Sequence, residues 1–145
     1  RRLGLNNMEA RLGDALVLND DYIGKFDYVL CDVPCSGMGI VRRKPEIKYK
    51  KEEEVENLPD LQYQILENAS SYLKEGGILI YSTCTIFKQE NTDVVDRFLN
   101  NHKDFDLDDL GPIKEFLGIG DKGLVKILPD RYEMDGFFIC RMKKI

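Results

Sequence analysis

The stretch FDYVLCDVPCSG, at residues 26–37, sets the fold because a strand-forming run is followed at once by residues that end a strand. Residues 26–33 are nearly continuous in apolar and β-favouring side chains, which predicts a strand buried on both faces. Pro34 cannot donate a hydrogen bond to a neighbouring strand, and Gly37 permits a turn. The sequence therefore predicts a buried strand whose carboxyl end opens into a short polar loop.

A helix, a second strand and a second helix are predicted further along the chain. An apolar stripe at helical spacing indicates a helix over residues 60–73, and GILIYS at residues 77–82 indicates another buried strand. The stripes consist of Leu61, Ile65, Leu66, Ala69, Tyr72 and Leu73 in the first helix, and of Val94, Val95, Phe98 and Leu99 in the second. This order is typical of a parallel α/β sheet with right-handed crossover connections.

The two ends of the chain are predicted to depart from that order. Residues 1–5 indicate the end of a helix, and residues 8–12 a short strand. Residues 124–128 and 137–142 indicate two strands joined by a polar loop, which predicts an antiparallel hairpin at the edge of the sheet. The Gly- and Asp-rich residues 104–123 are expected to form a long connection with at most a short helical turn.

The chain has 145 residues, of which 43% are hydrophobic and 32% charged, the composition of one compact globular domain rather than a disordered segment. No apolar run approaches the roughly 20 residues of a membrane span, and no secretory signal is visible. We therefore expect a cytoplasmic protein with no membrane partner. The chain begins at Arg1 without an initiating Met, so we expect it to be a fragment or a processed product.

The net charge of −5 argues mildly against independent binding of nucleic acid, which usually needs a basic domain. A local cluster of cations nevertheless follows the first strand, namely Arg42, Arg43, Lys44, Lys48, Lys50 and Lys51. One interpretation is a solvated face with charge pairing, and the other is a patch that contacts phosphate groups. Because the cluster lies just after Cys35, we prefer the second interpretation, with Arg42, Arg43 and Lys44 as the main candidates.

The four cysteines fall into two environments. Cys31 and Cys140 lie in apolar, strand-like runs, where a free cysteine behaves as a small hydrophobic side chain. Cys35 and Cys84 lie among small polar residues, just past the ends of the two predicted buried strands. The spacing matches no zinc motif and the only histidine is His102, so no metal is expected. Disulfides are not expected in a cytosolic protein.

Cys35, Cys84 and the carboxylate of Asp32 are predicted to meet in one cleft. Ligands bind beyond the carboxyl ends of the strands in open parallel sheets, and strands joined by a single helix are expected to be neighbours. A reactive thiol needs solvent access and a lowered pKa, which nearby cations or a helix amino terminus can supply. The simpler alternative is that each cysteine is a small loop residue without a chemical role.

Six motifs stand out along the chain, namely DVPCSG at residues 32–37, RRKPE at 42–46, Leu73 through Gly77, STCT at 82–85, Glu90-Asn91 and DGFF at 135–138. Together, these motifs resemble the Sun/Fmu-type RNA cytosine-5 methyltransferases, and most closely the bacterial branch that modifies small-subunit ribosomal RNA. The resemblance covers nearly the whole chain. It implies that residues 1–145 are the carboxy-terminal portion of a Rossmann-like class I methyltransferase domain that uses S-adenosylmethionine.

The resemblance also implies roles for individual residues. Cys84 is the thiol that attacks carbon 6 of cytosine, which makes carbon 5 nucleophilic enough to accept a methyl group. Cys35 is implied to release the product, by assisting loss of the carbon-5 proton or collapse of the adduct. Asp32 is implied to contact the cytosine edge or the methyl donor, and Asp14 the adenine end of the cofactor. An ordinary turn is the alternative interpretation of Asp14.

Parts of the cofactor site are implied to precede Arg1. The family carries a glycine-rich cofactor loop and an acidic residue for the ribose on earlier strands, and the bacterial branch also has an amino-terminal RNA-binding domain. The segment alone is therefore expected to bind S-adenosylmethionine weakly or not at all, and not to turn over. Its sheet is expected to keep an unpaired edge that is prone to association.

Several alternatives remain at this stage. Ribosomal RNA is the preferred partner, and transfer RNA is the alternative substrate of the same chemistry. A catalytically silent RNA-binding or scaffold segment is the second possibility, and the presence of both Cys35 and Cys84 favours an enzyme over it. A base-amino methyltransferase would carry an acid-Pro-Pro-aromatic motif after the first strand, and Pro34-Cys35 points away from that class.

Overall fold

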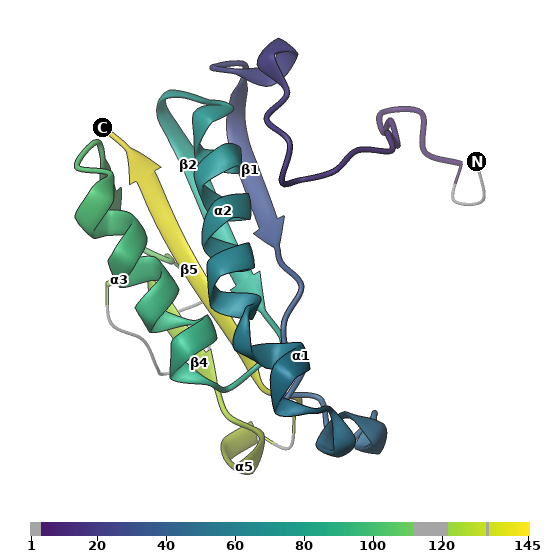
Figure 1. Cartoon of the computed structure of the whole chain (residues 1–145). Coiled ribbons are helices and arrows are strands. Elements are labelled where there is room, and N and C mark those ends of the chain that lie inside the picture. The colour runs from purple at the N-terminus through teal and green to yellow at the C-terminus, as the bar shows by residue number, and fades with distance from the viewer. Residues whose placement is uncertain (1–3, 112–121, 133) are drawn as a thin grey trace.

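The computed structural model describes residues 4–111, 122–132 and 134–145, and its strands form one sheet (Figure 1). The strands are β1 (Phe26–Asp32), β2 (Leu73–Thr83), β3 (Phe105–Leu107), β4 (Leu124–Ile127) and β5 (Phe137–Lys144). The α-helices are α1 (Glu52–Glu56), α2 (Leu58–Ser71), α3 (Thr92–Asn101) and α5 (Pro129–Tyr132). Three short 3-10 helices, η1 (Asp20–Tyr22), η2 (Pro45–Tyr49) and η3 (Lys88–Glu90), lie in the connections.

The sheet is mixed, with strand order β1-β2-β5-β3 and with β4 also paired to β5. β1 and β2 are parallel, and their register sets Asp32 opposite Ser82. β5 runs antiparallel to each of its three partners, β2, β3 and β4. The predicted order of strand, helix, strand and helix is therefore confirmed for residues 26–101, and the reversed β5 accounts for the mixed character of the sheet.

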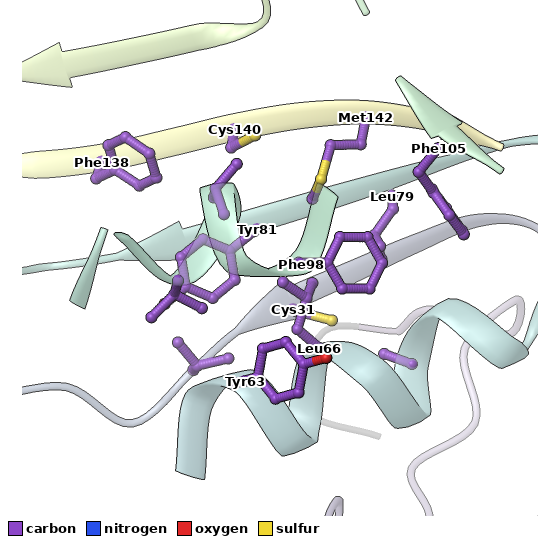
Figure 2. Packing of buried hydrophobic residues seen from close by; sticks show 14 of the residues in the cluster. Cys31, Tyr63, Leu66, Leu79, Tyr81, Phe98, Phe105, Phe138, Cys140 and Met142 are labelled. Carbon is purple, nitrogen blue, oxygen red and sulfur yellow. The ribbon is translucent and has the colours of Figure 1, made fainter. Parts of the chain in front are cut away.

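The main core lies between the sheet and the two helices α2 and α3, which cover one of its faces (Figures 1 and 2). Alternate residues of β5 enter opposite clusters, as the two-residue period of a strand requires. Phe138, Cys140 and Met142 join the main core, whereas Phe137 and Ile139 pack against a smaller cluster on the other side. Cys140 and Cys31 are buried, so the prediction that they are core residues is confirmed.

The two longer helices form for ordinary sequence reasons. α2 has a proline in its first turn together with Asp60, and both features favour a helix amino terminus. Its buried apolar side chains include Leu66 and Ala69, which lie on the predicted stripe. α3 buries Val94, Val95 and Phe98 as predicted. Among the residues that the structure describes, no helix is long and apolar enough to cross a membrane.

The prediction that the first strand is buried on both faces is wrong. β1 alternates between sheltered and open positions, and Tyr28 and Leu30 keep 72% and 66% of their surface exposed. Cys31 and Val29 on the opposite face contact the main core. The reason is that β1 pairs with β2 alone and is covered by α2 on only one face in the part of the chain that the structure describes.

Near the two ends of the chain, the structure confirms the predicted hairpin but not the predicted strand at residues 8–12. The hairpin is confirmed by the antiparallel pairing of β4 with β5, but β5 lies inside the sheet rather than at its edge, because its apolar residues serve both faces. Residues 8–12 form no strand and are exposed, so that prediction is wrong. The long connection contains β3, while the helix end at residues 1–3 and any turn within residues 112–121 lie outside the described residues.

Candidate active site

The parallel register of β1 and β2 brings the two predicted thiols together. The chain leaves both strands at the same edge of the sheet, and Val33 N–H donates to the Ser82 carbonyl at 3.2 Å. The Sγ atoms of Cys35 and Cys84 lie 3.2 Å apart, within hydrogen-bonding distance for sulfur. Both side chains are half-buried, which leaves them accessible to a ligand. The edge of the sheet therefore carries a pair of adjacent thiols.

Asp32 ends β1 at this edge and is exposed. Ser82 Oγ donates to its carboxylate at 3.0 Å, across the parallel pair of strands. The hydroxyl fixes one oxygen of the carboxylate and leaves it open to solvent. Asp32 is thus placed at the same edge as the two thiols, as predicted, although no described contact joins it directly to either sulfur.

The electrostatics of Cys35 differ from those of a typical reactive thiol, whose pKa is lowered by its surroundings. Burial, and then the hydrogen bond with Cys84, raise the pKa of Cys35 to about 12. Cys35 therefore keeps its proton at neutral pH and can offer it to the Cys84 sulfur. One cation does approach the loop, since Lys50 Nζ donates to the Ser36 carbonyl at 2.9 Å, but burial of the thiol is the largest influence on the pKa of Cys35.

The loop that carries Cys35 is joined to the start of β5 by close backbone contacts. Gly39 N–H donates to the Cys84 carbonyl at 2.9 Å, and Gly136 N–H donates to the Gly39 carbonyl at 2.7 Å. A side chain on Gly39 would collide with the Gly136 carbonyl, so only glycine fits there. Gly37 adopts the predicted turn, with a φ of 78° that favours glycine.

Sequence reasoning missed a buried polar cluster behind the two cysteine loops. Glu90 is only 3% exposed, and Gln62 and Asn91 are also buried. Glu90-Asn91 was part of the family resemblance, but no role was assigned to either residue, and Gln62 was not singled out at all. The available signal was weak, because a polar residue at the start of a helix usually faces solvent.

The three predicted basic residues follow the Cys35 loop in the chain. Arg42, Arg43 and Lys44 are all exposed. Arg43 forms an ion pair with Asp135, the residue before the glycine that contacts the Cys35 loop. The pair holds the basic segment beside the site, and it partly neutralises the charge of Arg43.

Asp14 lies in a local turn, which is the alternative that the sequence left open. Its carboxylate accepts from Leu16 N–H at 2.9 Å, and its carbonyl accepts from Val17 N–H at 3.1 Å. The next residue contacts the carboxy-terminal half of α2, through Asn68 Nδ2 and the Ala15 carbonyl at 3.0 Å. The Cys35 loop contacts the amino-terminal half of that helix, so the described contacts do not bring Asp14 to the thiols.

No group of three His, Cys, Asp or Glu side chains is arranged to hold a metal ion in the described ranges of the chain. The chemical groups at the site are therefore two thiols, one exposed carboxylate and a buried polar cluster. This set suits covalent catalysis by sulfur, with a carboxylate to hold a ligand beside it.

Solved structures define the class of this fold. The chain aligns with "The crystal structure of NSun6 from Pyrococcus horikoshii with SFG" at a TM-score of 0.81 and 28% identity, over 99% of this chain and 36% of that one. It also aligns with a methyltransferase homologue protein from the same organism at a TM-score of 0.67 and 29% identity, over 84% of this chain and 40% of that one. The fold is the α/β fold of methyltransferases, as predicted.

Sequence comparison then identifies the family. A family model described as 16S rRNA methyltransferase RsmB/F matches residues 1–143, and the chain belongs to that family. The probable ribosomal RNA small subunit methyltransferase B of Bacillus subtilis is 40% identical over 99% of this chain. The ribosomal RNA small subunit methyltransferase F of Vibrio cholerae is 32% identical over the same share. The chain spans 33% and 31% of these two relatives, about a third of their length.

Proposed function

We propose that the intact protein containing this chain is an S-adenosylmethionine-dependent RNA cytosine-5 methyltransferase that acts on 16S ribosomal RNA. The observation that carries the proposal is the 3.2 Å approach of Cys35 and Cys84 at the carboxyl edge of β1 and β2. Relatives named as small-subunit ribosomal RNA methyltransferases support the class of substrate. The solved relative that holds SFG, an analogue of S-adenosylmethionine, supports the cofactor.

Cys84 is the attacking thiol in this proposal. Its sulfur forms a bond to carbon 6 of cytosine, and the ring electrons move to carbon 5, which then becomes nucleophilic. S-adenosylmethionine supplies the methyl group that carbon 5 accepts. Because Cys35 retains its proton at neutral pH and contacts Cys84, its S–H group stabilises negative charge on the attacking sulfur before the bond forms.

Cys35 then acts in release. The methylated ring must lose the proton from carbon 5, and the bond between Cys84 and carbon 6 must break as the electrons return to the ring. Cys35 lies on the neighbouring loop, with its sulfur 3.2 Å from the Cys84 sulfur that must leave the ring. As the bond to carbon 6 breaks, the Cys84 sulfur takes the proton of Cys35, and the Cys35 thiolate so formed accepts the carbon-5 proton. The raised pKa of Cys35 makes this thiolate a strong base.

The residues around the thiols fit the cofactor in part. The carboxylate of Asp32 is exposed and held by Ser82, so it can accept hydrogen bonds from the methyl donor or from the cytosine edge. Asp14 remains a proposal for the adenine end. Because the glycine-rich loop is expected on earlier strands, we infer that this segment alone does not turn over and that the intact cytoplasmic protein does.

RNA contact is proposed for the basic segment beside the site. Arg42, Arg43 and Lys44 are exposed and follow the Cys35 loop, where a phosphate near the target base would lie. Transfer RNA, which would present the same base and phosphates, is the alternative substrate.

The test uses the intact protein, tritiated S-adenosylmethionine and unmodified 16S ribosomal RNA. Cys84→Ala is expected to abolish methyl transfer, because no group remains to attack carbon 6. Cys35→Ala is expected to leave protein covalently bound to RNA, visible as a shifted band that survives denaturant. An active Cys84→Ala protein would contradict the assignment of Cys84 as the attacking thiol. Methylation of transfer RNA in preference to 16S ribosomal RNA would support the alternative substrate.

A further inference from the structure

Glu90 occupies an unusual position for a carboxylate. It is almost fully buried at the junction of η3 and α3, behind both cysteine loops. A buried charged group is costly unless hydrogen bonds satisfy it, and Glu90 is well supplied with donors. Ser36 N–H and Gln62 Nε2 donate to its Oε2 at 2.8 and 2.9 Å, and Thr85 Oγ1 donates to its Oε1 at 3.3 Å.

These contacts hold the residues on both sides of Cys35. The Glu90 carboxylate binds the Ser36 backbone, directly after the cysteine. Gln62, which is fully buried, bridges Glu90 to the Pro34 carbonyl at 2.9 Å, directly before the cysteine. The backbone around Cys35 is therefore fixed from two sides by one buried pair of side chains.

The residues on both sides of Cys84 are held in the same way. Thr85 Oγ1 lies 2.8 Å from Ser36 Oγ and also contacts Glu90, so it links the two loops. The neighbouring Asn91 accepts from Thr83 Oγ1 at 2.6 Å and donates to the Thr85 carbonyl at 3.0 Å. Glu90 and Asn91 thus form a support for both cysteine loops.

We propose that Glu90 is a positioning residue that, with Asn91, sets the separation of the Cys35 and Cys84 sulfurs. The effect of Glu90 on catalysis rests on the proposed function, but its effect on the separation of the sulfurs rests only on the contacts described above. Hydrogen bonds strengthen in a buried, low-dielectric setting, and a reaction between groups on two loops depends on the relative placement of those loops. Glu90 contacts neither sulfur, so its effect passes through Ser36 and Thr85.

Two substitutions separate positioning from charge. In Glu90→Gln, the amide oxygen can accept from Ser36 and Gln62, and the amide nitrogen can donate to Thr85 Oγ1, so the support survives without its charge. In Glu90→Ala, every one of these bonds is lost. Val95→Ala is the matched control, because Val95 is buried in α3 and contacts the core rather than the cysteine loops.

The first readout is a disulfide between Cys35 and Cys84, formed by the oxidant diamide. Each thiol loses one hydrogen, diamide accepts both, and the sulfurs must close from 3.2 Å to the bonded distance of about 2.05 Å. Peptide mapping of the intact protein follows the rate. Glu90→Ala is expected to form this disulfide about tenfold more slowly, roughly as a small displacement predicts, whereas Glu90→Gln and Val95→Ala stay close to the wild-type rate.

The second readout is methyl transfer to unmodified 16S ribosomal RNA. Glu90→Ala is expected to lower kcat by about 100-fold, the scale of a 1 Å misplacement, with little change in KM for the RNA. Glu90→Gln restores most of the activity. If Glu90→Ala does not fold, Thr85→Val removes the link between the loops, and a slower disulfide with reduced kcat is expected there too.

Equal disulfide rates in wild type and Glu90→Ala would overturn the inference, as would an equally slow Val95→Ala protein. With Thr85→Val as the only folded variant, an unchanged disulfide rate overturns it. The proposed function fails separately, when the wild-type protein forms the disulfide readily and methylates no RNA. That result would leave the support of the two sulfurs intact.

Discussion

The sheet core and the carboxyl edge of the sheet each hold two of the four cysteines, and the two settings differ in what surrounds the sulfur. Cys31 and Cys140 lie among apolar side chains between the sheet and its helices (Figure 2). Cys35 and Cys84 lie on loops whose neighbours are hydroxyls, amides and one buried carboxylate. The same side chain serves as a packing group in one region and as one of a pair of facing thiols in the other.

The comparison shows that pKa alone does not distinguish the two settings. Burial raises the pKa of Cys31 to about 12, and burial together with the bond to Cys84 raises the pKa of Cys35 to the same level. The two cysteines differ instead in solvent access and in their contacts, since Cys35 is half-buried and its sulfur lies 3.2 Å from a second sulfur. A search for reactive cysteines that ranked residues by pKa would miss this difference.

The largest expected effect is in alkylation of the folded protein. Iodoacetamide should modify Cys84 at least about 10³-fold faster than Cys31 or Cys140, because the core thiols become accessible only when the structure opens. Peptide mapping after timed alkylation measures the ratio. In urea, where the protein is unfolded and all four cysteines are exposed, they should react at similar rates. Alkylation of Cys140 as fast as Cys84 in the folded state would break the comparison.

A smaller effect, about 100-fold, is expected in the pH dependence of Cys35. Because its pKa is about 12, the reactive thiolate should increase about tenfold per pH unit from pH 7 to 9 and still rise at pH 10. The Cys84→Ala protein is used because Cys35 is then the one half-buried thiol that reacts. The substitution removes the hydrogen bond to Cys84 but keeps the burial of Cys35, which is the larger cause of its raised pKa. A short cysteine peptide, whose rate levels off near pH 9.5, is the reference. A plateau below pH 9 for Cys35 would contradict the raised pKa.

The smallest effect concerns stability and the core cysteine Cys31. In the folded protein the Cys31 thiol keeps its proton up to about pH 12, whereas in the unfolded chain it ionises near its ordinary pKa. The contribution of Cys31 to the free energy of unfolding is therefore complete at neutral pH and falls above about pH 9. The expected loss is about 1.4 kcal/mol per pH unit. Cys31→Ala should therefore show a shallower fall in unfolding free energy between pH 9 and 10, measured by urea denaturation. Val95→Ala, which removes no titrating group, should keep the wild-type slope, and an unchanged slope in Cys31→Ala would refute the assignment.

The sequence was most informative where one periodic pattern decided the structure. The apolar stripe of α2 and the apolar run of β2 each specified their element, and their order placed Cys35 and Cys84 at neighbouring strand ends. The exposed face of β1 was not predictable from its composition, because a run such as Tyr28-Val29-Leu30 fits a fully buried strand as well as an edge strand. The strand prediction for residues 8–12 failed because a five-residue stretch in which apolar and charged residues alternate carries little information about strands.

The buried support behind the cysteines was also beyond sequence reasoning. Glu90 and Asn91 belong to polar residue types that usually face water, and only the fold shows that Glu90 points inward between two loops. Gln62 is buried because of its position on α2, and its partners Pro34 and Glu90 are distant in the chain. Such contacts of long sequence separation leave no local pattern.

The contact between Gly39 and Gly136 has a consequence for biosynthesis. Both cysteines are translated well before Gly136, so the bond from Gly136 N–H to the Gly39 carbonyl can form only after that residue has been made. β5, which follows Gly136 directly, pairs with β2 once it has been translated. A nascent chain that stops short of this strand carries both thiols and their support from Glu90 and Asn91, but it lacks the backbone contact that ties the Cys35 loop to the start of β5.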